Sequence, residues 1–366
     1  MNQFMRRFEN YTWVDGIIDA IRVAIILAVV IGTFNTLASG KYELRTWLNL
    51  IVAGLAQGSI YALIALGYTL VYGILLMINF AHGEVFMIGS LSTYFFADYL
   101  FKSGFLNAYP LLAIPLMVIF AGLISTTVAV LLERIAYRPL RGAPRLVTLI
   151  TAIGASFFVQ YTARGLYGSD FRTYPRVDAL SADYPALGIT GGNIGLGIVE
   201  ISITQVVVIV MATLLMLLLY FLVERTKIGK AMRAVSENKE VSTLMGVNIN
   251  QVIMFTFAIG GFLAGAAGVI SGLYRPQGIS FSMGFRPGIK AFTAAVLGGI
   301  GSIPGAMLGG LFLGVIEQLG PNLILDGLGV PGPNQLQDVI AFTMLLLVLI
   351  FRPQGILGEK LSEKKA

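Results

Sequence analysis

The segment LNLIVAGLAQGSIYALIALGYTLVYGIL, residues 48–75, decides the fold class because it contains no acidic or basic side chain. About 20 apolar residues are enough for a helix to cross a bilayer, so this segment is long enough to span one. The rest of the chain has the same character. Of its 366 residues, 56% are hydrophobic and only 12% are charged, against roughly 25% charged residues in soluble domains. We therefore predict an integral membrane protein.

Apolar runs as long as this one predict helices instead of a β-barrel, whose strands alternate apolar and polar residues over roughly 10 positions. We predict an all-α polytopic membrane helix bundle with about ten transmembrane segments, near residues 17–38, 48–75, 79–97, 111–132, 146–162, 200–223, 249–271, 285–300, 303–320 and 338–351. Three of these are short or are interrupted by glycine and polar residues, which predicts broken or re-entrant helices at 79–97, 285–300 and 338–351.

Basic residues in the predicted loops orient the bundle, because cytoplasmic loops of membrane proteins are enriched in Lys and Arg. The loops at 133–145 and 224–250 and the tail after Phe351 are net basic, whereas the connection 163–198 balances its charges. Ten crossings then place both termini in the cytoplasm. We predict that 17–38 is a retained anchor helix, since no convincing small-residue cleavage site follows it. If it were cleaved, nine crossings would remain.

The composition excludes several classes of function. The chain has no cysteine, which removes disulfides and thiolate catalysis, and its single histidine, His82, cannot form a histidine metal cluster. No G-x-x-x-x-G-K-[ST] phosphate loop is present, so the chain does not hold ATP in that way itself. We predict that it is not an enzyme and has no cofactor or metal of its own. The net charge of +6 belongs to the loops and indicates no nucleic-acid partner.

Polar residues inside the apolar segments are candidates for function, because such groups must be solvated, paired or functional. Asn79, His82 and Glu84 follow one apolar run directly. Asn79 is a candidate N-cap with Glu84 in the first turns of the next helix; the alternative is a direct role in transport. Gln57 and Tyr61 lie four residues apart, so they share a helix face. They either hydrogen-bond across helices or line a translocation path.

Glycines are unusually dense in this chain. Pairs four residues apart allow close helix packing, and they occur at Gly54/Gly58, Gly261/Gly265, Gly268/Gly272, Gly305/Gly309 and Gly310/Gly314. The glycines from 298 to 314, together with Pro304, predict a broken helix near Gly301–Pro304 that forms a lining or a hinge. The candidate translocation-path or gate residues are therefore Gln57, Tyr61, Asn79, His82, Glu84, Gly301 and Pro304.

The predicted cytoplasmic loop 224–250 is long enough to form structure of its own. Residues 230–245 contain good helix formers and are followed by Gly246, a typical helix stop. We predict one short amphipathic helix there. It either lies on the membrane surface or docks on another protein.

Five motifs resemble one family of transporters. The stretches GSIYALIALGY (58–68), INFAHGE (78–84), ERIAYRPL (133–140), AFTAAVLGGIGSIPG (291–305) and RPQGILG (352–358) are similar, in the same order, to the permease subunit of branched-chain amino-acid ABC importers. The resemblance runs from about residue 50 to 358. It implies a multi-subunit importer in the bacterial inner membrane. Its partners would be a second homologous permease, two cytoplasmic ABC ATPases that use ATP, and a periplasmic binding protein for leucine, isoleucine or valine.

The resemblance also implies that the loop 224–250 docks the ATPases, with Gly229, Arg233, Glu237 and Gly246 as the coupling residues. The loop lacks the EAA-type sequence of other importer classes, so this assignment rests on position. The implied organisation is an N-terminal cytoplasmic segment with an extra anchor helix at 1–47, a permease domain at 48–358 and a cytoplasmic tail at 359–366. The alternatives are a urea or short-amide permease of the same family and, from another class, a self-sufficient secondary transporter or channel.

Overall fold

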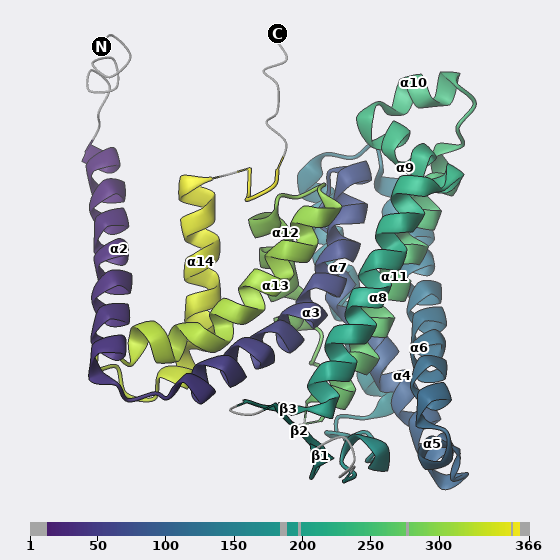
Figure 1. Ribbon diagram of the computed structural model, residues 1–366. Coiled ribbons are helices and arrows are strands. Elements are labelled where there is room, and N and C mark those ends of the chain that lie inside the picture. The colour runs from purple at the N-terminus through teal and green to yellow at the C-terminus, as the bar shows by residue number, and fades with distance from the viewer. Residues whose placement is uncertain (1–12, 184–188, 197–198, 276–277, 353, 359–366) are drawn as a thin grey trace.

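The computed structural model describes residues 13–183, 189–196, 199–275, 278–352 and 354–358, and these form a bundle of helices (Figure 1). The helices of the first half are α2 (Trp13–Ser39), α3 (Leu44–Leu75), α4 (His82–Lys102), α5 (Phe105–Ala108), α6 (Pro110–Leu132), the π-helical η1 (Glu133–Tyr137), η2 (Arg138–Leu140), α7 (Arg145–Tyr167) and η3 (Asp178–Leu180). Those of the second half are α8 (Ile203–Arg225), α9 (Lys227–Glu237), α10 (Lys239–Leu244), α11 (Ile249–Tyr274), α12 (Phe285–Gly298), α13 (Ile303–Gly320), η5 (Pro321–Leu325), η6 (Pro333–Leu336) and α14 (Gln337–Phe351).

Each of the ten predicted segments contains one helix, so the prediction of an all-α membrane bundle is confirmed. Eight helices in the described part of the chain are long and apolar enough to cross a membrane. The other two are α4 and α12, which belong to two of the three segments identified above as short or interrupted. With 14 residues, α12 is about 21 Å long and does not reach across a hydrocarbon core of about 30 Å.

Burial separates inner helices from outer ones. In both α3 and α11, 72% of the most apolar 18-residue window is buried, whereas the values for α2 and α14 are 6% and 11%. Lipid rewards no burial of apolar side chains, so an inner helix must gain its stability from close contact. The central position of α3 therefore places its polar side chains inside protein.

Glycine supplies that close contact where α3 packs against α13. A Cβ atom at Gly314 would overlap the backbone of Gly58, and one at Gly310 would overlap Ala62. The same holds between α12 and α13, where a Cβ at Gly305 would overlap the carbonyl group of Gly298. Packing is thus the physical role of these glycines, as predicted.

The predicted break between the eighth and ninth segments is confirmed. Helix α12 ends at Gly298 and α13 begins at Ile303, and the connection contains Gly299 and Gly301 with φ angles of +103° and +98°. Such φ angles favour glycine, which has no Cβ. Pro304 lies in the first turn of α13, where its missing N–H costs no helical hydrogen bond.

The C-terminal motif completes this break from the other side. The N–H groups of Ile356 and Leu357 donate to the carbonyl oxygens of Leu297 and Gly298 at 2.8 and 3.0 Å. These carbonyls belong to the last turn of α12 and would otherwise lack a helical partner. The stretch after α14 therefore caps α12.

The two ends of the bundle differ in structure. Figure 1 shows α9 and α10 at one end, together with the start of α2 and the end of α14. The opposite end carries α5 and a small antiparallel sheet in the order β1-β2-β3, with β1 Ile189–Thr190, β2 Asn193–Leu196 and β3 Val199–Ser202. Thr190 pairs with Asn193, and Asn193 pairs with Ser202. The α9–α10 loop, predicted to lie inside, and the strands of the connection predicted to lie outside therefore lie at opposite ends.

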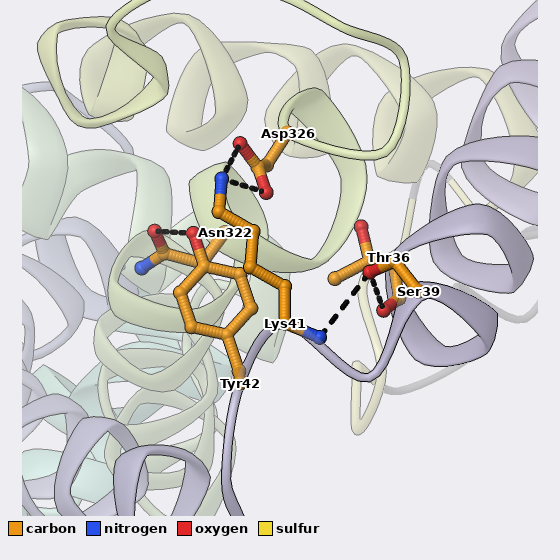
Figure 2. Close-up of polar contacts among 6 residues, drawn as sticks. All are labelled: Thr36, Ser39, Lys41, Tyr42, Asn322 and Asp326. Carbon is orange, nitrogen blue, oxygen red and sulfur yellow. Dashed lines mark hydrogen bonds and ion pairs between the residues drawn. The ribbon is translucent and has the colours of Figure 1, made fainter.

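Helix α2 is attached to the remainder near its C-terminal end (Figure 2). The ammonium group of Lys41 bonds both carboxylate oxygens of Asp326 at 2.8 Å, and this hydrogen bonding raises the pKa of Lys41. Tyr42 donates to Asn322 at 3.3 Å. A Cβ at Gly327 would overlap the backbone carbonyl of Gly32, so α2 also approaches the segment after η5 closely. The added helix is therefore joined to the rest of the bundle.

Candidate functional site

The first polar group lies where α3 ends and α4 begins. Helix α3 is closed by Leu76, whose φ of 55° is left-handed and whose N–H donates to Tyr72 at 2.8 Å. The N-cap position of α4 is occupied by Ala81, so the prediction that Asn79 is the N-cap is wrong. The side chain of Asn79 instead accepts a hydrogen bond of 2.6 Å from Tyr137 in η1. Its backbone carbonyl accepts the N–H of His82 at 3.0 Å.

His82 and Glu84 begin α4 and are both buried, with 2% and 1% exposure. Glu84 lies in the first turn, as predicted. The imidazole of His82 meets the ring of Tyr68 edge to face, with centroids 4.9 Å apart. It occupies the space that a side chain at Gly67 would fill.

Glu84 joins α4 to α7. One carboxylate oxygen accepts a hydrogen bond of 3.4 Å from Ser156, and the other has no hydrogen-bond partner among the described residues. The carboxylate also faces Gly284, where a Cβ would come within 2.8 Å of it. A buried carboxylate with spare acceptor capacity is an expensive group in a membrane protein and is typical of a functional position.

A second buried polar group was not foreseen from the sequence. The ammonium group of Lys290 in α12 lies 2.6 Å from Glu317 in α13 and 2.5 Å from Asp338 in α14. Tyr61 of α3 donates to the same Glu317 oxygen at 3.3 Å. Lys290 and Glu317 are 8% and 4% exposed. The ion pairs of this cation and the Tyr61 hydrogen bond together join four helices, and we call these four residues the lysine cluster.

The signal for the lysine cluster was present in the sequence. Lys290, Glu317 and Asp338 are charged residues inside three predicted spans, and such residues are rare and mark functional positions. A hydropathy average over a span does not reveal these residues, because a single charge is diluted among many apolar neighbours. For Tyr61 the cross-helix hydrogen bond is the alternative that the structure bears out.

The seven predicted path residues lie at three places. Gln57 and Tyr61 are on α3, and the amide nitrogen of Gln57 is buried without a hydrogen-bond partner in the described part of the chain. Asn79, His82 and Glu84 are at the start of α4; Gly301 and Pro304 are at the connection between α12 and α13. A role for any of them in transport stays a prediction.

The loop predicted to hold one amphipathic helix holds two, so that prediction is wrong. Helix α9 ends at Glu237, and Asn238 has an extended backbone with φ −154°. Its side chain accepts the N–H of Val241 at 3.0 Å and so caps α10. The stop at Gly246 is confirmed, because this residue has φ +83° and its N–H donates to Thr243 at 2.9 Å.

The coupling residues implied by the resemblance divide into two kinds. Arg233 donates to the carbonyl oxygen of Val223 at 2.8 Å and pairs with Glu224 at 2.8 Å. A Cβ at Gly229 would overlap that same Val223 carbonyl. These two residues therefore hold α9 against the end of α8.

The second kind faces outward. Glu237 is exposed at the end of α9, and the apolar side chains of Leu244 and Met245 are 86% and 79% exposed. We call Glu237, Leu244 and Met245 the loop tip. Two large apolar side chains exposed side by side on a loop between spans are a candidate contact for another protein.

Comparison with known proteins identifies close relatives. The family model described as branched-chain amino acid transport system / permease component matches residues 50–349. The high-affinity branched-chain amino acid transport system permease protein BraD of Pseudomonas aeruginosa is 45% identical over 88% of this chain and 99% of its own length. The LivH permease proteins of Salmonella typhimurium and Escherichia coli K12 are 42% and 40% identical, each over 85% of this chain and 95% of their own length.

A solved structure, PsaBC from Streptococcus pneumoniae in complex with Fab, aligns with 86% of this chain and 94% of the solved chain. Its TM-score is 0.40 and its sequence identity 13%, so no structural inference rests on it.

Proposed function

This chain belongs to the family of permease components of branched-chain amino acid transport systems, and from that premise we propose that it is the permease subunit of an ATP-driven importer for branched-chain amino acids. The observation that carries the proposal is the match along nearly the whole length of relatives with that printed role. The lack of a phosphate loop in the sequence is consistent with energy supplied by separate ATPase subunits.

The proposed complex contains a second homologous permease, two cytoplasmic ATPases and a periplasmic binding protein. We assign the ATPase contact to the loop tip, because Leu244 and Met245 expose apolar surface on the α9–α10 loop. Arg233 and Gly229 would act indirectly by keeping α9 on the end of α8. The end of the bundle with α9 and α10 is then cytoplasmic in the inner membrane, in agreement with the basic loops.

The experiment compares Leu244→Asp with the conservative control Leu244→Met in the reconstituted complex. The readouts are co-purification of the ATPase and ATP-dependent leucine uptake into vesicles in the presence of the binding protein. We expect Leu244→Asp to lose both while the chain still inserts into the membrane, because a charge replaces an apolar contact. Leu244→Met keeps the apolar surface and should retain both co-purification of the ATPase and leucine uptake.

Two results would overturn the proposal. Normal uptake by Leu244→Asp would remove the docking assignment. Uptake by the purified chain alone, without ATP, would instead identify a channel or a secondary transporter. Competition of leucine uptake by valine and isoleucine, with no competition by urea, tests the substrate class.

A further inference from the structure

A cavity of about 640 Å³ opens at the α9–α10 end of the bundle. It lies among the end of α3, the segment η1–η2, the start of α7, the start of α10 and the N-terminal part of α11. It is separate from the lysine cluster and from the loop tip, because none of their residues line it. Most of its wall is apolar, with Leu75, Leu146, Leu149 and Ile253 among its members.

Among the described residues that line the cavity, two are charged and both are basic: Arg141 from the segment after η2 and Lys239 at the start of α10. Arg141 pairs with Glu133 and donates to Asn250 at 2.5 Å. Its Nε is buried and has no hydrogen-bond partner in the described chain.

Lys239 forms no ion pair with any described carboxylate. Burial, and then the positive charge of Arg141, lower its pKa. Two cations thus line one partly enclosed space that no described carboxylate lines. An anion at this place would pair with the ammonium group of Lys239 and relieve its repulsion by Arg141.

The apolar wall continues out of the cavity along α7. Leu146 lines the cavity and is 65% exposed, and Ile150, Ile153 and Phe157 follow on the same helix with 61%, 41% and 51% exposure. Their spacing of four, three and four residues places them on one face of α7. A ligand with an anionic headgroup and a long hydrocarbon chain could therefore place the headgroup beside the basic side chains in the cavity and the hydrocarbon chain along α7.

We propose that this cavity binds an anionic phospholipid, with its phosphate between Arg141 and Lys239 and one acyl chain along the exposed face of α7. Basic pockets between membrane helices near the cytoplasmic surface suit such headgroups. A free amino acid fits less well, because its ammonium group would meet two cations and no carboxylate among the described lining residues. Since Lys239 begins α10, the bound lipid joins the α9–α10 loop to α3 and α7. The assignment to the cytoplasmic leaflet rests on the orientation proposed above, whereas the binding itself does not.

The test uses the purified full-length chain and native mass spectrometry, titrated with phosphatidylglycerol or with phosphatidylcholine of the same acyl chains. We expect the chain to retain phosphatidylglycerol preferentially. Lys239→Gln should weaken that binding about fivefold, the change expected for one basic side chain next to an anionic headgroup, and leave phosphatidylcholine unaffected. Lys239→Arg keeps the charge and should retain the binding. Lys230→Gln is the matched control, because Lys230 is exposed on α9 and does not line the cavity.

A second variant tests the acyl-chain contact. Leu146→Asn removes apolar wall without changing charge and should lower retention of both lipids. Equal retention of the two lipids by the unaltered chain would overturn the proposal, as would equal loss in Lys239→Gln and Lys230→Gln. Displacement of phosphatidylglycerol by millimolar inorganic phosphate would assign the cavity to a free anion and would overturn it as well.

Discussion

Replacement of Lys290 by methionine should be the most destabilising single change in the lysine cluster. Methionine has a similar length and leaves the packing of α12 largely in place, so the effect reports the lost charge. Without the ammonium group, the one hydrogen bond that Glu317 keeps with the described side chains is that of 3.3 Å from Tyr61. Asp338 loses its 2.5 Å partner as well.

The magnitude follows from burial. Removing one member of a buried ion pair costs about 3–5 kcal/mol, because the partner charge is left uncompensated. The side chain of Glu317 is 5% exposed and should incur this cost, whereas that of Asp338 is 45% exposed and remains solvated. We therefore expect a loss of about 3 kcal/mol in the free energy of unfolding, from the low end of that range.

The assay is reversible unfolding of the purified chain by sodium dodecyl sulfate in mixed micelles, followed by circular dichroism. Lys230→Met serves as the control, since it removes an exposed lysine and should change stability by less than about 0.5 kcal/mol. The double variant Lys290→Met/Glu317→Gln should regain at least about 1 kcal/mol over Lys290→Met, because no uncompensated carboxylate of α13 remains.

Two outcomes would refute this account. If Lys290→Met lowers the free energy of unfolding by less than about 1 kcal/mol, the charge of Glu317 is compensated by a group other than Lys290. Strictly additive effects of the Lys290 and Glu317 substitutions would show that the two side chains do not interact in the folded protein.

The remaining predictions concern helix packing. Gly67→Val should destabilise the chain by about 2 kcal/mol in the same assay, because the new side chain would occupy the place of the His82 imidazole. The control is Gly165→Val in α7, where the space around the glycine is open. This control should cost less than half as much. Asp326→Asn removes an ion pair whose lysine is 56% exposed and should cost less than about 1 kcal/mol. Gly327→Val should instead detach α2, seen as faster trypsin cleavage between α2 and α3, and unchanged cleavage would contradict the close contact at this glycine.

The elements at the start of α4 and in the α9–α10 loop show where local patterns were insufficient. Asn79 is a residue type that favours the N-cap position, but α4 begins two residues later than an N-cap at Asn79 requires. The side chain of Asn79 instead accepts a hydrogen bond from Tyr137 in η1. Residues 230–245 have good helix formers throughout, yet Asn238 begins a second helix by capping it. In both places an asparagine side chain had several partners available, and the sequence alone does not choose among them.

The membrane class, the ten helical segments and the break before α13 followed from the sequence by itself. Bilayer thickness, helix geometry and the backbone freedom of glycine act on neighbouring residues, so a local window contains the information. Only the tertiary structure determined three other features: the lysine cluster, the packing of His82 against Gly67, and the cavity lined by Arg141 and Lys239. Each depends on which helix faces meet, and that choice is made by shape complementarity between helices far apart along the chain.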